Sequence, residues 1–404
     1  MTIIQPDYIF TSDTLLHHSA IAFDETIVQI GDFETLHQRY PDAKVITCKP
    51  HSLLMPGLIN AHVHLEFSAN KTTLEYGSFL PWLHSVIKNR EVLIKGCDET
   101  CMRHSVAMML QNGITTFGAV SSHGLDLQAA AEAPQNVIFF NELIGSQAAM
   151  ADALYGDFLQ RLDASRAVTR KGFYPAIAIH SPYSVHPILI KRALELAKNE
   201  NLPLSAHYME SPAEREWLDH NSGDFTPFFK EFLNLENAVN SSDTFLELFK
   251  HHKALMTHVV HASKQELETL RQQGHSVVHC PISNRLLGNG AIDLEALENA
   301  GISWLCATDG LSSNYTLDLF EEMKIALFMH HGADLLPLAK QLIQSVTCKA
   351  ADALGLNSGR IEAGRDADFL ILNLDEAPTQ QLPIHLLLHR YTIESIFIRG
   401  NKEL

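Results

Sequence analysis

Two histidines separated by one residue follow an apolar run in the segment Pro56–Ser68, which reads PGLINAHVHLEFS. In a β-strand the side chains at positions i and i+2 point to the same face, so the imidazoles of His62 and His64 would aim at one point. Imidazole nitrogens are common ligands of Zn2+ and other transition metals. Because the chain has 23 histidines, two core or surface histidines that are close by chance are the alternative. A metal site therefore needs further ligands from elsewhere in the chain.

Three further polar residues could complete such a site. His207 lies in SAHYMES, Glu210 follows three residues later, and Asp309 lies in ATDGLSSN beside a glycine. Alone, Asp309 could be a helix N-cap or an Asx turn, and His207 could be a hydrogen-bonded core histidine. Together, His62, His64, His207 and Asp309 form a set of three imidazoles and one carboxylate, which suits one Zn2+ or Fe2+ ion in an open, catalytic site. Glu210 would turn back over the same opening.

Eight short apolar segments, each rich in strand-forming residues, would position these side chains. Most of them are followed by a helical pattern, which predicts a (β/α)8 TIM barrel with its chemistry at the C-terminal ends of the strands. His180 would end the fourth strand and His258 the sixth. The segments are LINAHVHL, ITTFGAV, VIFFNEL, YPAIAIH, PLSAHY, ALMTHVV, SVVHCPI and SWLCATD.

The two chain ends break this β/α order. Residues 1–50 read as short strands that include a hairpin in IAFDETIVQIGD, and strand-like segments return after about residue 357. We therefore expect a small β-domain from residues 1–54 and 357–404, with the barrel at 55–356. Helical periodicity over 81–111 ends near Gly113. The aromatic residues of 219–252 are predicted to be core, with a lid over the site as the alternative.

Composition narrows the class of protein. The 30 Lys and Arg residues against 47 Asp and Glu residues give a net charge of −17, which disfavours binding to nucleic acid or to an anionic membrane. The first residues, MTIIQPDYIFTSD, lack the features of a signal peptide, and no apolar run is as long as a membrane span. The six cysteines are scattered and show no disulfide or zinc-ribbon pattern. These features predict a cytoplasmic enzyme with a small-molecule substrate.

Several motifs along the chain resemble those of the amidohydrolase superfamily, in its metal-dependent deaminase branch. The resemblance implies that the small β-domain is a β-sandwich, and it also implies a homodimer. Two-metal members carry a carboxylated lysine on the fourth strand, whereas the fourth strand here has none, so one metal ion is expected. The motifs are PGLINAHVH, HSPYS, HYMES, THVVH, CPISNRLLGNG, TDGLSSN and GRIEAGRDADF.

The resemblance also implies roles in displacing ammonia from an aromatic amidine. Glu210 would take a proton from water, deliver it to a ring nitrogen and help to protonate the leaving amine. His258 would orient the water, with His261 of the same THVVH motif as its rival. His180 would contact the base or sugar, or else be a buried histidine bonded to the backbone.

Finer details resemble the aminodeoxyfutalosine deaminases of the futalosine route to menaquinone, in NAHVHLEFSANK, YGSFLPWL, SNRLL and TDGLSSN. Such enzymes hydrolyse the 6-amino group of an adenine nucleoside that carries a benzoate. Arg285, and after it Lys71, could bind the carboxylate, unless they are solvated loop charges. Ser283 could hydrogen-bond near the base. The aromatic residues that could stack on base or benzoate, or that could instead be core, are Phe67, Phe79 and Trp82.

Three alternatives remain at this level. A related deaminase could act on S-adenosylhomocysteine or methylthioadenosine, and a formimino or amide hydrolase could use the same scaffold. A non-catalytic barrel that serves as a scaffold is disfavoured, because every predicted ligand position is filled.

Overall fold

The computed structural model describes residues 1–70 and 73–404 and contains a parallel sheet whose strands follow one another in chain order. All eight segments that the sequence predicts as barrel strands are strands of this sheet. The prediction of a (β/α)8 barrel is confirmed. The strands are β8 (Leu58–Val63), β9 (Ile114–Ser121), β10 (Asn136–Leu143), β11 (Phe173–Ile179), β12 (Leu204–Tyr208), β13 (Leu255–His258), β14 (Ser276–His279) and β15 (Trp304–Cys306).

Side chains help to close the barrel between its first and last strands. Asn60 Nδ2 donates to Thr308 Oγ1 at 2.7 Å, and the Thr308 backbone N–H donates to Asn60 Oδ1 at 3.1 Å. The Asp309 N–H also donates to the His62 carbonyl at 3.1 Å. Because Asn60 and Thr308 are fully buried, these hydrogen bonds are shielded from water. The closure places Asp309 beside the two histidines of β8.

Helices cover the outside of the barrel. The region predicted as helical over 81–111 forms two helices, because Asp98 interrupts it and accepts a hydrogen bond from Cys101 N at 2.9 Å as an N-cap. Gly113, with φ of +84°, ends the second of them. The helices are α2 (Phe79–Gly96), α3 (Glu99–Gln111), α4 (Leu127–Ala131), α5 (Ala151–Arg166), α6 (Pro187–Glu200), α7 (Pro212–His220), α10 (Lys264–Gln273), α11 (Pro281–Leu286), α12 (Leu294–Ala300), α13 (Leu319–Met329), α14 (Leu335–Ser345) and α15 (Cys348–Leu354).

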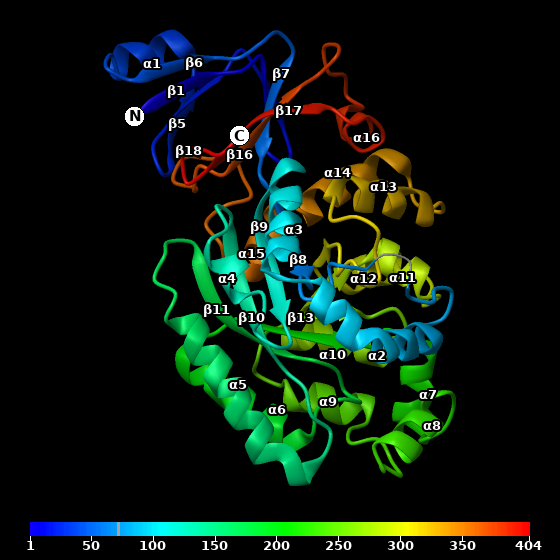
Figure 1. Cartoon of the computed structure of the whole chain (residues 1–404). Helices are drawn as coiled ribbons and strands as arrows, with labels where there is room; N and C mark the ends of the chain where they lie inside the picture. The colour runs from blue at the N-terminus through cyan, green and yellow to red at the C-terminus, as the bar shows by residue number, and fades with distance from the viewer. Residues whose placement is uncertain (71–72) are drawn as a thin grey trace.

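The two chain ends lie together beside the barrel, with the blue N-terminal and red C-terminal strands side by side in Figure 1. They form two sheets, with strand orders β5-β4-β1-β6 and β18-β17-β16-β7-β2-β3. The ring of Phe23 packs edge-on against Phe369 and Phe397, with centroids 5.1 and 5.5 Å apart. The elements are β1 (Thr2–Gln5), β2 (Tyr8–Phe10), β3 (Leu15–His17), β4 (Ala20–Phe23), β5 (Ile27–Gly31), α1 (Phe33–Arg39), β6 (Lys44–Thr47), β7 (Ser52–Pro56), β16 (Phe369–Asn373), α16 (Leu382–Leu388), β17 (Thr392–Ile398) and β18 (Asn401–Lys402).

The predicted small domain from both chain ends therefore exists, and β4 and β5 form the predicted hairpin. The domain limits 54/55 and 356/357 stay predictions, and β7 spans the first of them.

Residues 219–252 contain two short helices, α8 (Phe225–Pro227) and α9 (Ser242–Leu248), and a π-helical turn over Phe228–Phe232. Phe225 and Phe229 are buried, and Phe229 stacks on Trp217 with centroids 4.8 Å apart. These aromatic residues are part of the core. Across the described residues, none of the helices combines the length and apolarity needed to cross a membrane.

Candidate active site

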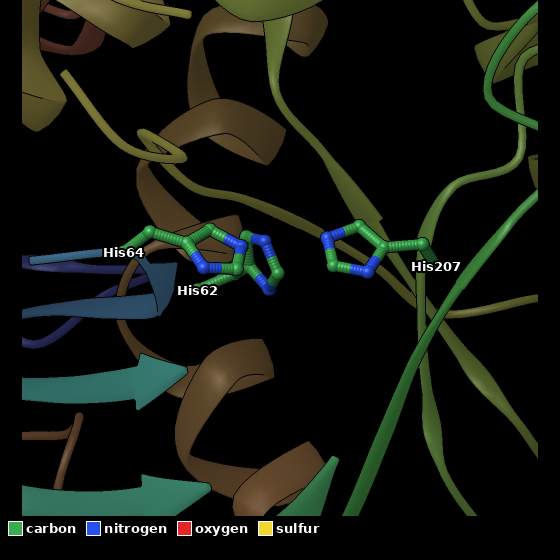
Figure 2. Close-up of side chains that lie close together, drawn as sticks. All are labelled: His62, His64 and His207. Carbon is green, nitrogen blue, oxygen red and sulfur yellow. The ribbon is translucent and has the colours of Figure 1, made fainter. Parts of the chain in front are cut away.

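Three imidazoles converge at the C-terminal end of the barrel strands. His62 and His64 lie at the end of β8, and His207 faces them from β12 (Figure 2). Each residue offers one ligand nitrogen, and these atoms all lie within 4.8 Å of one another. The ring centroid of His62 lies 4.9 Å from those of both His64 and His207. This spacing allows one small ion to contact all three.

The pKa values of His64 and His207 and the unpaired nitrogen of His62 suit a cation. His207 Nδ1 donates to the His180 carbonyl at 2.9 Å, so its Nε2 carries the lone pair. Burial and the charge of neighbouring imidazoles lower the pKa of His64 to about 4 and that of His207 well below its usual value. His62 Nε2 is buried with no hydrogen-bond partner among the described residues. A buried, unpaired acceptor of this kind fits a metal ion.

Asp309 supplies the carboxylate of the set. Its Oδ1 lies 3.7 Å from His62 Nε2 and 3.8 Å from His64 Nε2. Its Oδ2 accepts hydrogen bonds from Ser283 Oγ at 2.8 Å and from Ser313 Oγ at 2.9 Å, which hold the group in place. Burial acts to raise the pKa of Asp309, but the imidazoles hold it well below its usual range. Three imidazoles and one carboxylate are a donor set for Zn2+ or Fe2+.

Glu210 is a buried carboxyl group beside this set. Its Oε1 accepts from Asn289 Nδ2 at 3.2 Å and lies 3.6 Å from His258 Nε2. Its backbone N–H donates to Glu214 Oε2 at 2.7 Å, which fixes the turn after β12. Burial, followed by the charges of Asp309 and Glu214, raises the pKa of Glu210 well above its usual value. A carboxyl group with a raised pKa can both accept and release a proton near neutral pH.

Of the two histidines in the THVVH motif, His258 lines the cleft at the barrel mouth and His261 does not. His258 has a left-handed backbone, with φ of +73°, and its Nδ1 lies 2.9 Å from Asn284 Oδ1. His261 is turned away, with its Nε2 2.8 Å from the Asn289 carbonyl. This arrangement brings His258, rather than His261, into the range of Glu210.

The cleft has a volume of about 520 Å³, which is in the range of small-molecule sites. Four of the residues named from the sequence as substrate contacts line it: Phe67, Phe79, Trp82 and His180. His180 Nδ1 is engaged with Ser184 Oγ at 2.7 Å, so the other ring nitrogen is left for a ligand.

Two other residues named as substrate contacts, Ser283 and Arg285, do not line the cleft. Ser283 is fully buried and donates to Asp309, so it supports a predicted metal ligand and does not line the cleft. Arg285 is exposed on α11 and is also not among the lining residues. Lys71 lies outside the described residues.

Sequence reasoning missed Glu142, which also lines the cleft. It lies near the end of β10 and is 1% exposed. Its Oε2 accepts from Ser122 Oγ at 2.5 Å, whereas Oε1 has no hydrogen-bond partner among the described residues and lies 3.9 Å from His207 Nδ1. Glu142, His180 and His207 form a second group of potential metal ligands that shares His207 with the first. Glu142 could have been identified from the sequence, because it lies at the C-terminal end of the third predicted barrel strand.

Two arginines of the cleft, Arg90 and Arg161, were also missed. They lie on α2 and α5, and the sequence indicates which residues are helical but not which helix face meets the cleft. Arg161 joins the ends of two strands, because it donates to the Ser121 carbonyl at 3.3 Å and to the Glu142 carbonyl at 2.9 Å.

Comparisons with known proteins agree with this fold. A model of the amidohydrolase family matches residues 53–402. The chain is 47% identical over 404 residues to an aminodeoxyfutalosine deaminase from Nitratiruptor sp., a match that covers 100% of this chain and 99% of that protein. It is 34% identical over 394 residues to an adenosine deaminase from Helicobacter pylori, covering 96% of this chain and 95% of that protein.

Among solved structures, the fold is similar to that of Helicobacter pylori aminofutalosine deaminase in complex with methylthio-coformycin. The TM-score is 0.94 and the sequence identity 32%, and the match covers 100% of both chains. The family match and the full-length identity to these proteins agree with each other. The chain therefore belongs to the amidohydrolase family.

Proposed function

We propose that this protein is a hydrolytic deaminase that removes the 6-amino group of an adenine nucleoside, converting 6-aminodeoxyfutalosine to futalosine and ammonia in menaquinone biosynthesis. One observation carries the proposal. Buried Glu210 lies 3.6 Å from His258 and opens onto the same cleft as His64, His207 and Asp309. The deaminases to which the chain is similar over its full length support the same reaction.

Members of this family use a divalent metal ion, and we propose one Zn2+ or Fe2+ ion for this chain. The residues that would hold it are His62, His64, His207 and Asp309. When bound, such an ion lowers the pKa of water, so that hydroxide is available at neutral pH.

Glu210 performs the proton transfers. Its carboxylate takes a proton from the attacking water and delivers it to the ring nitrogen beside the amino-bearing carbon. It then helps to protonate the leaving amine. Burial supports this role, because it raises the pKa of Glu210 toward the range in which both transfers are efficient. Asn289 holds the carboxyl group with a hydrogen bond of 3.2 Å.

His258 orients the attacking water. Its Nδ1 is engaged by Asn284, so the Nε2 lone pair points toward Glu210. Burial lowers the pKa of His258 to about 4, which keeps the ring neutral and able to accept a hydrogen bond. His180 is placed to contact the base or sugar. A homodimer and a cytoplasmic location stay predictions.

Initial rates of ammonia release across a series of 5′-substituted adenosines test the proposal. We expect kcat/KM for 6-aminodeoxyfutalosine to exceed the values for adenosine, methylthioadenosine and S-adenosylhomocysteine. Equal turnover of adenosine and methylthioadenosine would overturn the substrate assignment. A metal-loaded protein that releases no ammonia from any of these nucleosides would overturn the proposed reaction.

A further inference from the structure

One face of α2 forms a wall of the cleft. The residues of this helix that line the cleft are spaced three, one, three, one and three positions apart, as expected for a single helix face. The first five are apolar, and the last is a cation. In chain order they are Phe79, Trp82, Leu83, Val86, Ile87 and Arg90.

The apolar part of this wall presents surface to the cleft. Ile87 is 38% exposed, although it belongs to the lining. Trp82 anchors the wall to the barrel, because its Nε1 donates to the Ser312 carbonyl at 2.8 Å. Apolar surface in a partly enclosed cleft is the usual lining for an apolar part of a ligand.

Arg90 differs from the other cleft arginine in its partners. Arg161 Nε donates to Asp157 Oδ2 at 3.0 Å, and its terminal nitrogens donate to two strand-end carbonyls. Arg90 forms no ion pair with any carboxylate of residues 1–70 and 73–404, and its Nη2 lies 3.1 Å from His123 Nε2. The Arg90 guanidinium is therefore a cation with donors available to an anionic ligand.

The loop that carries His123 is fixed to the barrel by Glu66. The two carboxylate oxygens of Glu66 accept hydrogen bonds from the backbone N–H groups of Ser122, His123 and Leu125, at 2.8, 3.0 and 2.9 Å. Phe67, the next residue, packs against the His123 ring with centroids 6.5 Å apart. The loop at this end of the cleft is therefore held in place by hydrogen bonds and by aromatic packing.

We propose that Arg90 binds a carboxylate at the far end of an apolar 5′ substituent that lies along α2. This inference rests on the proposed function, and it replaces Arg285, which does not line the cleft, as the residue that binds the tail. Arg90 is eight residues beyond Trp82, or about 12 Å along the helix axis, which leaves room for an aromatic ring between nucleoside and carboxylate. The net charge of −17 disfavours an anionic tail, and a local cation in the cleft offsets this repulsion.

The test compares 6-aminodeoxyfutalosine with its methyl ester, which lacks the negative charge and adds only one methyl group. We expect Arg90→Gln to lower kcat/KM for the acid roughly 10- to 100-fold, chiefly through KM, and to leave the ester within about twofold. Arg90→Lys should recover part of the loss. Arg285→Gln is the matched control, because it removes another exposed arginine. It should leave kcat/KM unchanged for both the acid and the ester. Deamination of adenosine 5′-monophosphate by the wild type and by Arg90→Gln tests whether Arg90 binds a phosphate instead of a carboxylate.

Equal losses for acid and ester in Arg90→Gln would overturn the assignment. So would a selective loss for the acid in Arg285→Gln, or a loss confined to the phosphate substrate. Calorimetric binding of futalosine to the wild type and to Arg90→Gln separates this inference from the proposed reaction. If the wild type releases no ammonia, the proposed function fails, and unchanged futalosine binding in the variant would still overturn the role of Arg90.

Discussion

Asn284 Oδ1 lies 2.9 Å from His258 Nδ1, and both side chains are buried. The amide nitrogen of Asn284 lies 3.5 Å from His279 Nδ1, and His279 Nε2 lies 3.1 Å from His330 Nε2. An amide oxygen only accepts hydrogen bonds, so His258 carries its proton on Nδ1 and presents an Nε2 lone pair to the cleft. Asn284 is therefore a positioning residue for His258.

Replacement of Asn284 by alanine should lower kcat roughly 10- to 100-fold, because the His258 tautomer is no longer fixed. The bound metal should remain, since Asn284 is not among the predicted ligands. Asn284→Asp retains the acceptor and should preserve more activity. Its added negative charge should raise the pKa of His258 and move the acidic limb of the kcat–pH profile upward. An unchanged kcat and pH profile in Asn284→Ala would remove this role.

Replacement of Glu210 by glutamine should abolish turnover without loss of metal. The amide keeps the shape of the side chain but cannot take a proton from water, so kcat should fall roughly 10²- to 10⁴-fold. Ammonia release and metal content measured on the same sample check both parts. Glu216→Gln, at an exposed position on α7, is the control and should retain full activity. Activity that survives in Glu210→Gln would mean that another group moves the proton.

The order of the barrel strands could be predicted because each buried strand is a short apolar run followed by a helical pattern. The same periodicity predicts that polar residues at strand ends meet at one mouth, and the structure brings His62, His64, His207 and Asp309 together there. Glu210 could be predicted to lie at the same mouth because it follows His207 by three residues.

Contacts between distant elements could not be predicted in this way. Arg285 was treated as a loop residue and Ser283 as a contact of the base, but both lie on α11, which buries Ser283 and exposes Arg285. Arg90 reaches the cleft only because of the way α2 is rotated against the barrel. The pairing of Asn60 with Thr308 depends on barrel closure, which joins residues 248 positions apart.

Removal of the metal should abolish activity reversibly. Three imidazoles and Asp309 fit a divalent ion, and binding to the folded state alone stabilises that state. Dialysis against a chelator should therefore stop ammonia release and lower Tm, and Zn2+ or Fe2+ should restore both. Full activity in a sample shown to be free of transition metal would contradict the assigned site.

Replacement of Gly310 by alanine should weaken metal binding. A Cβ atom at this position would lie 2.9 Å from both the Cβ and the carbonyl oxygen of His64, so His64 must shift. Crowding of this kind costs about 1–3 kcal/mol. Gly332→Ala is the control, because no atom lies within 4 Å of its added Cβ. Chelator competition measures metal affinity in both variants, and equal affinities would show that His64 adapts without cost.

Replacement of Asp126 by asparagine should stabilise the protein at alkaline pH. Burial, and after it the charge of Glu66, raises the pKa of Asp126 to about 8, and Ser121 Oγ donates to its Oδ1 at 2.5 Å. Because the folded pKa is above the unfolded value of about 3.9, the folded state retains a proton that the unfolded chain releases as pH rises. The stability contributed by protonated Asp126 is therefore present below pH ~4 and lost as pH rises through about 8.

Asparagine keeps the volume and the acceptor oxygen but carries no charge, so it avoids this loss. The variant should gain stability over the wild type between pH ~4 and ~8, by at most about 1.4 kcal/mol per pH unit, and the difference should then level off. Urea unfolding across this range measures it. For the control Asp42→Asn, at an exposed position, the difference in unfolding free energy from the wild type should not change with pH. A difference for Asp126→Asn that is equally flat would mean that the folded protein holds Asp126 ionised at no cost.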